Sequence, residues 1–398
     1  MPCHLSTLAD SRLIGDNNTM IPNLNAPTYV ATESALHELV AQLQAEALIA
    51  VDTESNSLYA YHEQVCLIQF STRTRDWVVD PLALPDLSVL APIFSDPRIE
   101  KVFHAAEYDL MTMKRDFGFS FANLFDTRIA ARIVALKAFG LGALLEDYFE
   151  VEVNKRFQRA DWSIRPIPPE QLKYAQQDTH FLPALRDNML DTLREHNRLQ
   201  EATEAFEALT TVPASEHHFD PDGYWNINVA RNFSRPQMAV LRELYLLREK
   251  IAEQRDRPPF KVFTDNLMAD IVKAAPTTLR ELSAIRGMSH PQVDRYGAKL
   301  LQAVQTGLNA DPPARPDRTP RIDPATLARF DALHEWRKTQ ALKRGVESDV
   351  IVPKEALWAL ARTVPGRLED LSAIPGLGPW KRQAYGPALI ELLSKFGK

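Results

Sequence analysis

The residues best suited to chemistry in this sequence are two acids, Asp52 and Glu54, near the end of the apolar run ALIAVDTES. Side chains at positions i and i+2 of a strand project from the same face of a sheet, so the two carboxylates are expected side by side. Two adjacent carboxylates at a strand end call for a cation. This spacing alone also fits the solvated face of an edge strand, so the interpretation depends on the other acids.

Two later segments supply further candidates for the same site. Asp109 follows the apolar stretch KVFHAA in a segment that turns into a helix, and Asp178 lies in the helical pattern EQLKYAQQDTHFL. Tyr174 precedes Asp178 by four residues, which puts both on one helical face. Four acids from three segments could converge on two divalent metals about 3.5–4 Å apart, which clamp the attacking and leaving oxygens of a phosphoryl transfer. The pattern predicts phosphodiester hydrolysis.

The segments around these residues indicate an α/β domain. The runs ALIAVDTES, VCLIQFS and DWVVD are spaced as an antiparallel strand meander. Helix-like and strand-like patterns alternate after them, from LSVLAPIF to RIAARIVAL. Residues 168–199 are expected to be helical, with an interruption at Pro183.

A repeat with a constant offset of 89 residues fills the rest of the chain. Arg248 corresponds to Arg337, the run LSAI at 282–285 to LSAI at 371–374, and Gly287 to Gly376. Each copy has apolar residues at helical spacing, so two small helical bundles are expected. The predicted organisation is an extension, an α/β domain that carries the acids, a linker, a first bundle, a Pro-rich linker and a second bundle, at 1–25, 26–210, 211–230, 231–310, 311–324 and 325–398.

The charge of the chain is divided between its parts. Residues 1–230 carry 18 Lys and Arg against 33 Asp and Glu, whereas the two bundles carry 13 against 8 (231–310) and 15 against 10 (315–398). An acidic first part fits a carboxylate site that needs cations, and basic modules behind it could hold a polyanion. A chance asymmetry is the alternative that charge alone leaves open.

Composition indicates a globular protein of two or three domains, with 398 residues of which 45% are hydrophobic. Its two cysteines, Cys3 and Cys66, exclude a disulfide framework and a cysteine zinc site, and Cys66 is expected in a buried strand. The first 25 residues contain no apolar signal region, and no segment approaches the roughly 20 apolar residues of a membrane span. A cytoplasmic location is the expectation.

The motifs VDTES, HAAEYD with NLFDT, and YAQQD resemble those of exonucleases that use four acids and a tyrosine, and most closely the ribonuclease D family. The segment QRADWSIRPIPPEQLKYAQQD is similar to that family's pattern, although Ala160 stands where a small hydroxyl residue is common. The duplicated bundles resemble HRDC domains, the helicase-and-ribonuclease-D C-terminal domains. The resemblance covers residues 26–395 and implies a ribonuclease-H-like α/β domain with a mixed sheet, followed by two small all-α HRDC-like bundles.

The resemblance also implies roles for the candidate residues. Asp52, Glu54 and Asp178 would ligate the metal that binds the nucleophilic water, while Asp52 and Asp109 would hold a second one. Mg²⁺ and Mn²⁺ suit such oxygen ligands. Tyr174 would aim the attacking water. The related subclass with a general-base histidine has it five residues before the last acid, where this chain has Lys173, so the tyrosine subclass is favoured.

Four further residues are predicted to contact substrate: Thr53, His104, Gln158 and Trp162. The last two lie in NKRFQRADW, a segment whose basic, amide and aromatic residues suit a clamp on a single-stranded 3′ end, although a plain surface loop fits equally. His104 could instead lie behind the metal ligands and hold them in place without touching the substrate. His180 is expected to point away from Asp178 and to pack or be solvated.

These observations together predict a monomeric 3′–5′ exoribonuclease that trims structured RNA, such as tRNA precursors, and releases nucleoside 5′-monophosphates. The RNA preference follows from the resemblance alone. A DNA 3′–5′ exonuclease of the repair type is the alternative within enzymes, because the same four acids would serve it. An inactive RNA-binding protein that kept the fold is the alternative outside enzymes.

Overall fold

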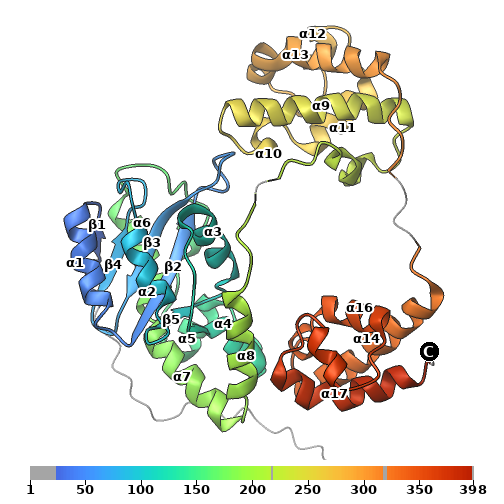
Figure 1. The fold of residues 1–398 in the computed structure, drawn as a ribbon. Helices are drawn as coiled ribbons and strands as arrows, with labels where there is room; N and C mark the ends of the chain where they lie inside the picture. The colour runs from blue at the N-terminus through green and yellow to red at the C-terminus, as the bar shows by residue number, and fades with distance from the viewer. Residues whose placement is uncertain (1–23, 217, 317–320, 397–398) are drawn as a thin grey trace, which may run out of the picture.

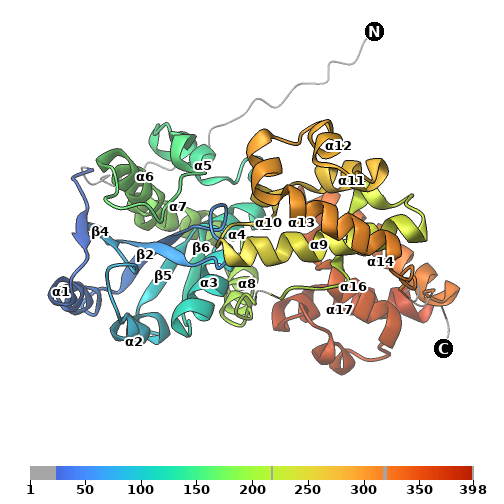
Figure 2. The ribbon, with the colours of Figure 1, turned by 90° about the horizontal axis from the view of Figure 1, so that it is seen from above.

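The computed structural model describes residues 24–216, 218–316 and 321–396. Its first part is a sheet with helices around it, and two separate helical modules follow along the chain (Figures 1 and 2). The predicted N-terminal extension, 1–25, lies almost entirely outside the described residues, as does Cys3.

Six strands form one mixed sheet in the order β1-β4-β3-β2-β5-β6. β3 pairs antiparallel with β2 and β4, whereas the β1–β4, β2–β5 and β5–β6 pairs are parallel. The predicted meander is confirmed, because β2, β3 and β4 hold its three runs, and Cys66 is buried in β3 as expected. The strands are β1 (Thr28–Val30), β2 (Leu48–Ser55), β3 (Val65–Ser71), β4 (Asp76–Val79), β5 (Glu100–Phe103) and β6 (Leu124–Asp126).

Helices pack on this sheet and build its core. α6 packs against β2, β3 and β4, while α7 packs against β2 and β5. The predicted interruption is confirmed, since α6 ends at His180 and α7 begins at Leu182, with Pro183 in its first turn. The helices are α1 (Glu33–Leu43), α2 (Ala91–Ser95), α3 (Glu107–Phe117), α4 (Thr127–Ile133), α5 (Leu141–Phe149), α6 (Pro169–His180), α7 (Leu182–Glu195) and α8 (Leu199–Thr210), with short 3₁₀ turns η1 (Ser88–Leu90) and η2 (Lys155–Phe157).

The two modules are built alike, as the repeat predicts. The Arg248 side chain donates to the carbonyl of Phe263, and Arg337, 89 residues later, donates in the same way to Val352. The first module contains α9 (Arg235–Gln254), α10 (Pro259–Val262), α11 (Asp265–Ala274), α12 (Leu279–Ser283) and α13 (His290–Asn309). The second contains α14 (Pro324–Arg344), α15 (Ser348–Ile351), α16 (Lys354–Thr363), η5 (Glu369–Ala373) and α17 (Pro379–Ser394).

The end of the predicted linker packs with the first module. Residues 223–230 form two short 3₁₀ turns, η3 (Gly223–Asn226) and η4 (Asn228–Ala230). Tyr224 and Ile227 are buried in the same cluster as the apolar residues of α9 and α11. The segment alternates polar and aromatic residues because its aromatic and apolar side chains cover the core of the first module.

The first module contacts the loop between β2 and β3, which reaches from the sheet toward α10 (Figure 1). The Asp256 carboxylate accepts hydrogen bonds from the backbone amides of Tyr61 (3.0 Å) and His62 (2.9 Å). The Tyr61 hydroxyl donates to Glu249 (2.5 Å). The β2–β3 loop therefore links the sheet to the first module.

The second module contacts a different surface, formed by α4 and α8. Arg344 makes an ion pair with Glu201 (2.7 Å) in which the carboxylate is buried and the Arg344 side chain is 12% exposed. Arg132 of α4 pairs with Glu347 (2.6 Å) and Asp349 (2.7 Å). Both modules dock through equivalent segments, since Glu347 and Asp349 lie 89 residues after Pro258 and Phe260, next to Asp256 of the first module.

Candidate active site

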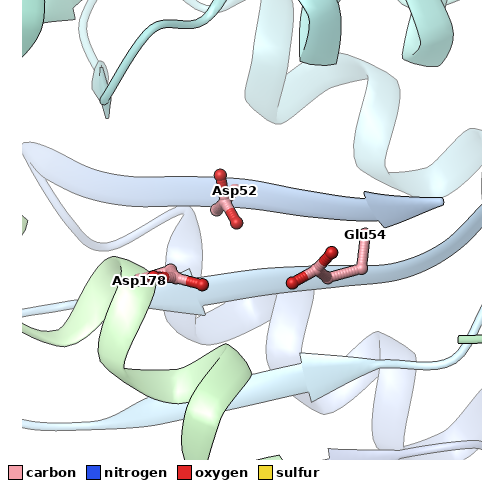
Figure 3. Close-up of side chains that lie close together, drawn as sticks. All are labelled: Asp52, Glu54 and Asp178. Atoms are coloured by element: carbon pink, nitrogen blue, oxygen red, sulfur yellow. The ribbon is translucent and has the colours of Figure 1, made fainter. Parts of the chain in front are cut away.

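Three acids meet between β2 and α6. Single carboxylate oxygens of Asp52, Glu54 and Asp178 all lie within 4.8 Å of one another. Figure 3 shows Asp52 and Glu54 on the strand and Asp178 reaching toward them from the neighbouring helix. The i, i+2 spacing on β2 puts the first two on one face of the sheet, and α6 covers that face.

Asp109 lies beside this group in the first turn of α3 and is only 7% exposed. Its carboxylate accepts a hydrogen bond from the Thr53 hydroxyl, which comes from the strand residue between Asp52 and Glu54. A helix N-terminus stabilises a carboxylate in this position. Thr53, predicted as a substrate contact, therefore orients Asp109.

Tyr174 is held beside the three acids by two aromatic rings. Its ring stacks on that of Trp162 at 6.0 Å between centroids and meets the edge of Phe157 at 6.1 Å. Burial and the nearby carboxylates of Asp178 and Glu54 raise the pKa of its phenol. The hydroxyl therefore stays protonated and is free to donate a hydrogen bond.

Polar contacts on the other side of α6 fix the helix on the sheet. The hydroxyls of Ser71 and Thr179 lie 2.7 Å apart. The Asp76 carboxylate is hydrogen-bonded to Gln176 (2.6 Å) and to Nδ1 of His180 (2.8 Å). His180 is thus packed away from Asp178, as predicted, and these contacts set the position from which Tyr174 and Asp178 face β2.

The raised pKa values of the four carboxyl groups indicate that the site favours a bound cation. Burial raises the pKa of Asp109 to about 7. Burial and the charge of Asp109 raise the pKa of Asp178 to about 7. The pKa of Asp52 and that of Glu54 are raised well above their usual values for the same two reasons, burial first and neighbouring carboxylates second. Ionised together, these groups need a cation.

A divalent metal fits this donor set. The ligand atoms are carboxylate oxygens from two separate elements, which is the chemistry that hard cations such as Mg²⁺ and Mn²⁺ select. The cation would offset the repulsion that raises the pKa values of the carboxyl groups. Asp52, Glu54 and Asp178 are placed to share one ion, and the Thr53 hydroxyl, from the residue between the first two, holds the carboxylate of Asp109.

The remaining predicted substrate contacts have different surroundings. Trp162 is 2% exposed and lies behind Tyr174, a position that does not fit a direct contact with substrate. Nδ1 of His104 lies 2.9 Å from the Thr127 hydroxyl, and burial lowers the pKa of its ring to about 4. His104 is therefore neutral and held by α4. Gln158 is exposed at the end of η2.

Gln69 is a further polar residue near the acids, and it was not among the predicted site residues. This residue is fully buried in β3, and neither polar atom of its side chain has a hydrogen-bond partner among the described residues. It pairs with Asp52 across the β2–β3 ladder, so both side chains lie on the same face. A glutamine inside the apolar run VCLIQFS is the signal that could have identified it.

The mixed sheet, its acidic strand end and the facing tyrosine define a nuclease domain of ribonuclease-H-like fold. Residues 27–194 match the family model described as 3′-5′ exonuclease, and residues 237–304 and 326–393 each match the HRDC domain. None of the described helices has the length and apolar character needed to cross a membrane.

Comparison with known proteins identifies the family of nucleases to which this chain is similar. The crystal structure of the catalytic core of RRP6 from Trypanosoma brucei superposes with a TM-score of 0.67 at 34% identity, over 73% of this chain and 82% of that one. The exosome complex exonuclease RRP6 of Saccharomyces cerevisiae is 34% identical over 292 residues, which are 70% of this chain but 40% of the yeast protein. Escherichia coli RNase D shares the fold over 94% of this chain (TM-score 0.65, 23% identity). The chain belongs to the 3′–5′ exonuclease family that includes RRP6.

Proposed function

We propose that this protein is a 3′–5′ exoribonuclease that hydrolyses RNA with two divalent metal ions, Mg²⁺ or Mn²⁺, and releases nucleoside 5′-monophosphates. The observation that carries the proposal is the convergence of Asp52, Glu54 and Asp178, with Tyr174 one turn before Asp178 on the same helix. The choice of RNA is supported by the relatives, one of which is named an exosome complex exonuclease and another an exoribonuclease involved in structured RNA processing.

Each residue of the site would have a separate role in hydrolysis. Asp52, Glu54 and Asp178 bind one ion and Asp52 with Asp109 the second, while Thr53 fixes the Asp109 carboxylate through its hydroxyl. Such ions lower the pKa of bound water and stabilise charge on the phosphate oxygens. Tyr174, locked between Trp162 and Phe157, donates or accepts a hydrogen bond at the attacking water and so sets its direction.

We further propose structured RNA 3′ ends, including those of tRNA precursors, as substrates. The support is the pair of basic helical modules docked on an acidic catalytic domain, since lysine and arginine provide sequence-independent attraction to phosphates. Both modules contact the catalytic domain of the same chain, which supports action as a monomer.

A denaturing-gel time course tests the proposal. RNA with a single-stranded 3′ tail and the matching DNA, each labelled at the 5′ end, are incubated with the full chain and Mg²⁺, Mn²⁺ or EDTA. The expected result is a ladder that shortens from the 3′ end, on RNA and only with metal.

Asp52→Asn is the matched control, because it keeps the side-chain volume but removes a charge that both ions would need. This variant should bind the RNA with nearly the affinity of the wild type while losing hydrolysis. Preferential trimming of DNA would replace the proposal with the repair nuclease. Binding without any ladder in the wild type would replace it with the inactive RNA-binding protein.

A further inference from the structure

An open cavity of about 620 Å³ lies on the first module, outside the carboxylate site. Its walls come from η3 and η4, from α9, from α10 and from the start of α11. The residues that matter for its chemistry are Asn226, Asn228, Val229, Phe260, Thr264 and Asn266.

The lining combines an aromatic face with amide edges. Phe260 is 52% exposed and Val229 is 44% exposed, so the cavity offers an accessible ring and an apolar side chain beside it. The three asparagine carboxamides are exposed, and none takes part in a side-chain hydrogen bond within the part of the chain that the structure describes. A carboxamide offers two donors and an acceptor, which match the edges of nucleobases.

The charges of the lining exclude a phosphate as the preferred ligand. Its one cation, Arg248, has a side chain only 9% exposed and is paired with Asp265 at 2.7 Å. The cavity therefore has no unpaired positive group to offer an anion. A flat, uncharged ring with a polar edge is complementary to it.

The cavity is also next to the contact that links the first module to the catalytic strand. Lys261, the neighbour of Phe260, places its ammonium 3.5 Å from the centre of the Tyr59 ring. Tyr59 belongs to the loop that follows Glu54 on β2, and its hydroxyl donates to the carbonyl of Arg159 (2.7 Å) in the predicted clamp segment. A strand whose 3′ end lies at the acids could continue along this loop to the cavity.

We propose that this cavity binds an unpaired base of the RNA, upstream of the 3′ nucleotide, by stacking on Phe260 and hydrogen bonding to the asparagine carboxamides. The proposal rests on the proposed exoribonuclease function. The site belongs to the first module alone, because Phe260, Thr264 and Asn266 correspond to Asp349, Pro353 and Glu355 in the second module.

The test compares full-length Phe260→Ala with Leu308→Ala, which removes an equally exposed apolar side chain (49%) from α13 of the same module. Binding of fluorescein-labelled single-stranded RNA is measured in EDTA, for a length series that begins with a dinucleotide. Stacking is worth about 1–3 kcal/mol per base, so Phe260→Ala should weaken binding of the longer RNA about tenfold. Dinucleotide affinity, and binding by Leu308→Ala, should be unchanged.

Phe260→Trp provides the rescue, since it keeps a ring that can stack. RNA carrying single 2-aminopurine substitutions should show quenching at one upstream position in the wild type and in Phe260→Trp, and none in Phe260→Ala. Equal affinities for all variants, or quenching that persists in Phe260→Ala, would overturn the proposal. Metal-dependent hydrolysis of the dinucleotide reports separately on the proposed function, because Phe260 lies outside the acidic site.

Discussion

Gln69 lies directly opposite Asp52 in the β2–β3 pair, so a buried carboxamide with no hydrogen-bond partner among the described residues lies next to a carboxylate of the acidic cluster. Buried polar groups in folded proteins are almost always hydrogen-bonded, and leaving one unsatisfied costs roughly 1–3 kcal/mol. The cost is tolerated where a group serves the site more than the fold. We infer that the Gln69 carboxamide serves the site beside Asp52 at a cost in the stability of the fold.

We expect Gln69→Leu, which replaces the amide by an apolar group of similar size, to raise the free energy of unfolding of the metal-free protein by about 1 kcal/mol. Hydrolysis should fall about tenfold. Urea denaturation in EDTA and single-turnover RNA hydrolysis measure the two effects. Ser71→Ala is the control, because Ser71 has a partner in Thr179 and its loss should destabilise the protein. A less stable Gln69→Leu would contradict this account of Gln69.

The pKa values of the acids predict an inverse dependence of stability on pH. Burial raises the pKa of Asp109 and of Asp178 to about 7 in the folded protein, whereas an unfolded Asp titrates at about 3.9. Between these values the folded state binds more protons than the unfolded state, so the free energy of unfolding must fall as pH rises from about 4 to about 7.

Thermal unfolding across this pH range in EDTA should show that decline. Mn²⁺ should flatten it, because the cation offsets the charges that appear as the carboxyl groups ionise. Asp52→Asn should flatten it without metal. A slope that is the same in EDTA, in Mn²⁺ and in the variant would assign the pH dependence to groups elsewhere in the chain.

Tyr174→Phe should separate the hydroxyl from the ring. The phenylalanine ring can keep the contacts with Trp162 and Phe157, so melting temperature and RNA affinity should stay close to those of the wild type. The maximal rate should drop about a hundredfold, since the attacking water loses its orientation. Quench-flow kinetics measures the rate. A comparable loss in RNA affinity would instead make Tyr174 a substrate-binding residue.

Arg344→Met should detach the second module from α8. It leaves the Glu201 carboxylate, 1% exposed, with Arg198 at 3.6 Å as its remaining charged contact. Removing one partner of a buried ion pair lowers stability by about 3–5 kcal/mol. This loss is larger than the stabilisation that exposed ion pairs between the module and the catalytic domain provide. Small-angle X-ray scattering should show a larger radius of gyration. Adding Glu201→Leu should restore docking; if it does not, the ion pair also specifies the orientation of the module.

The convergence of Asp52, Glu54 and Asp178 was predictable because each acid lies in a short motif whose periodicity fixes the direction of its side chain. Asp52 and Glu54 share a strand face, and Tyr174 and Asp178 share a helix face. The repeat likewise predicted two modules with the same internal contacts, such as those of Arg248 and Arg337.

The sequence did not predict how distant surfaces meet. Arg344 and Glu201 are 143 residues apart, and nothing local distinguishes them from solvated charges. Trp162 was predicted at the substrate because its neighbours are basic and polar, whereas burial behind Tyr174 depends on the packing of α6. The predicted cytoplasmic location stays a prediction.

The equivalent docking segments of the two modules have a consequence for how such an architecture diversifies. After a duplication, substitutions in one short stretch, 249–261 in the first copy and 338–350 in the second, change which surface a copy contacts, and the Trp380 amide of α17 adds a hydrogen bond to Glu204 in the second copy. Only the outward-facing residues of these stretches can change in this way, because Ile251 and Ala252 in the first copy and Ala341 in the second belong to the buried cores. A chimera that exchanges the outward-facing residues of these stretches should therefore exchange the surfaces of the catalytic domain that the two modules contact.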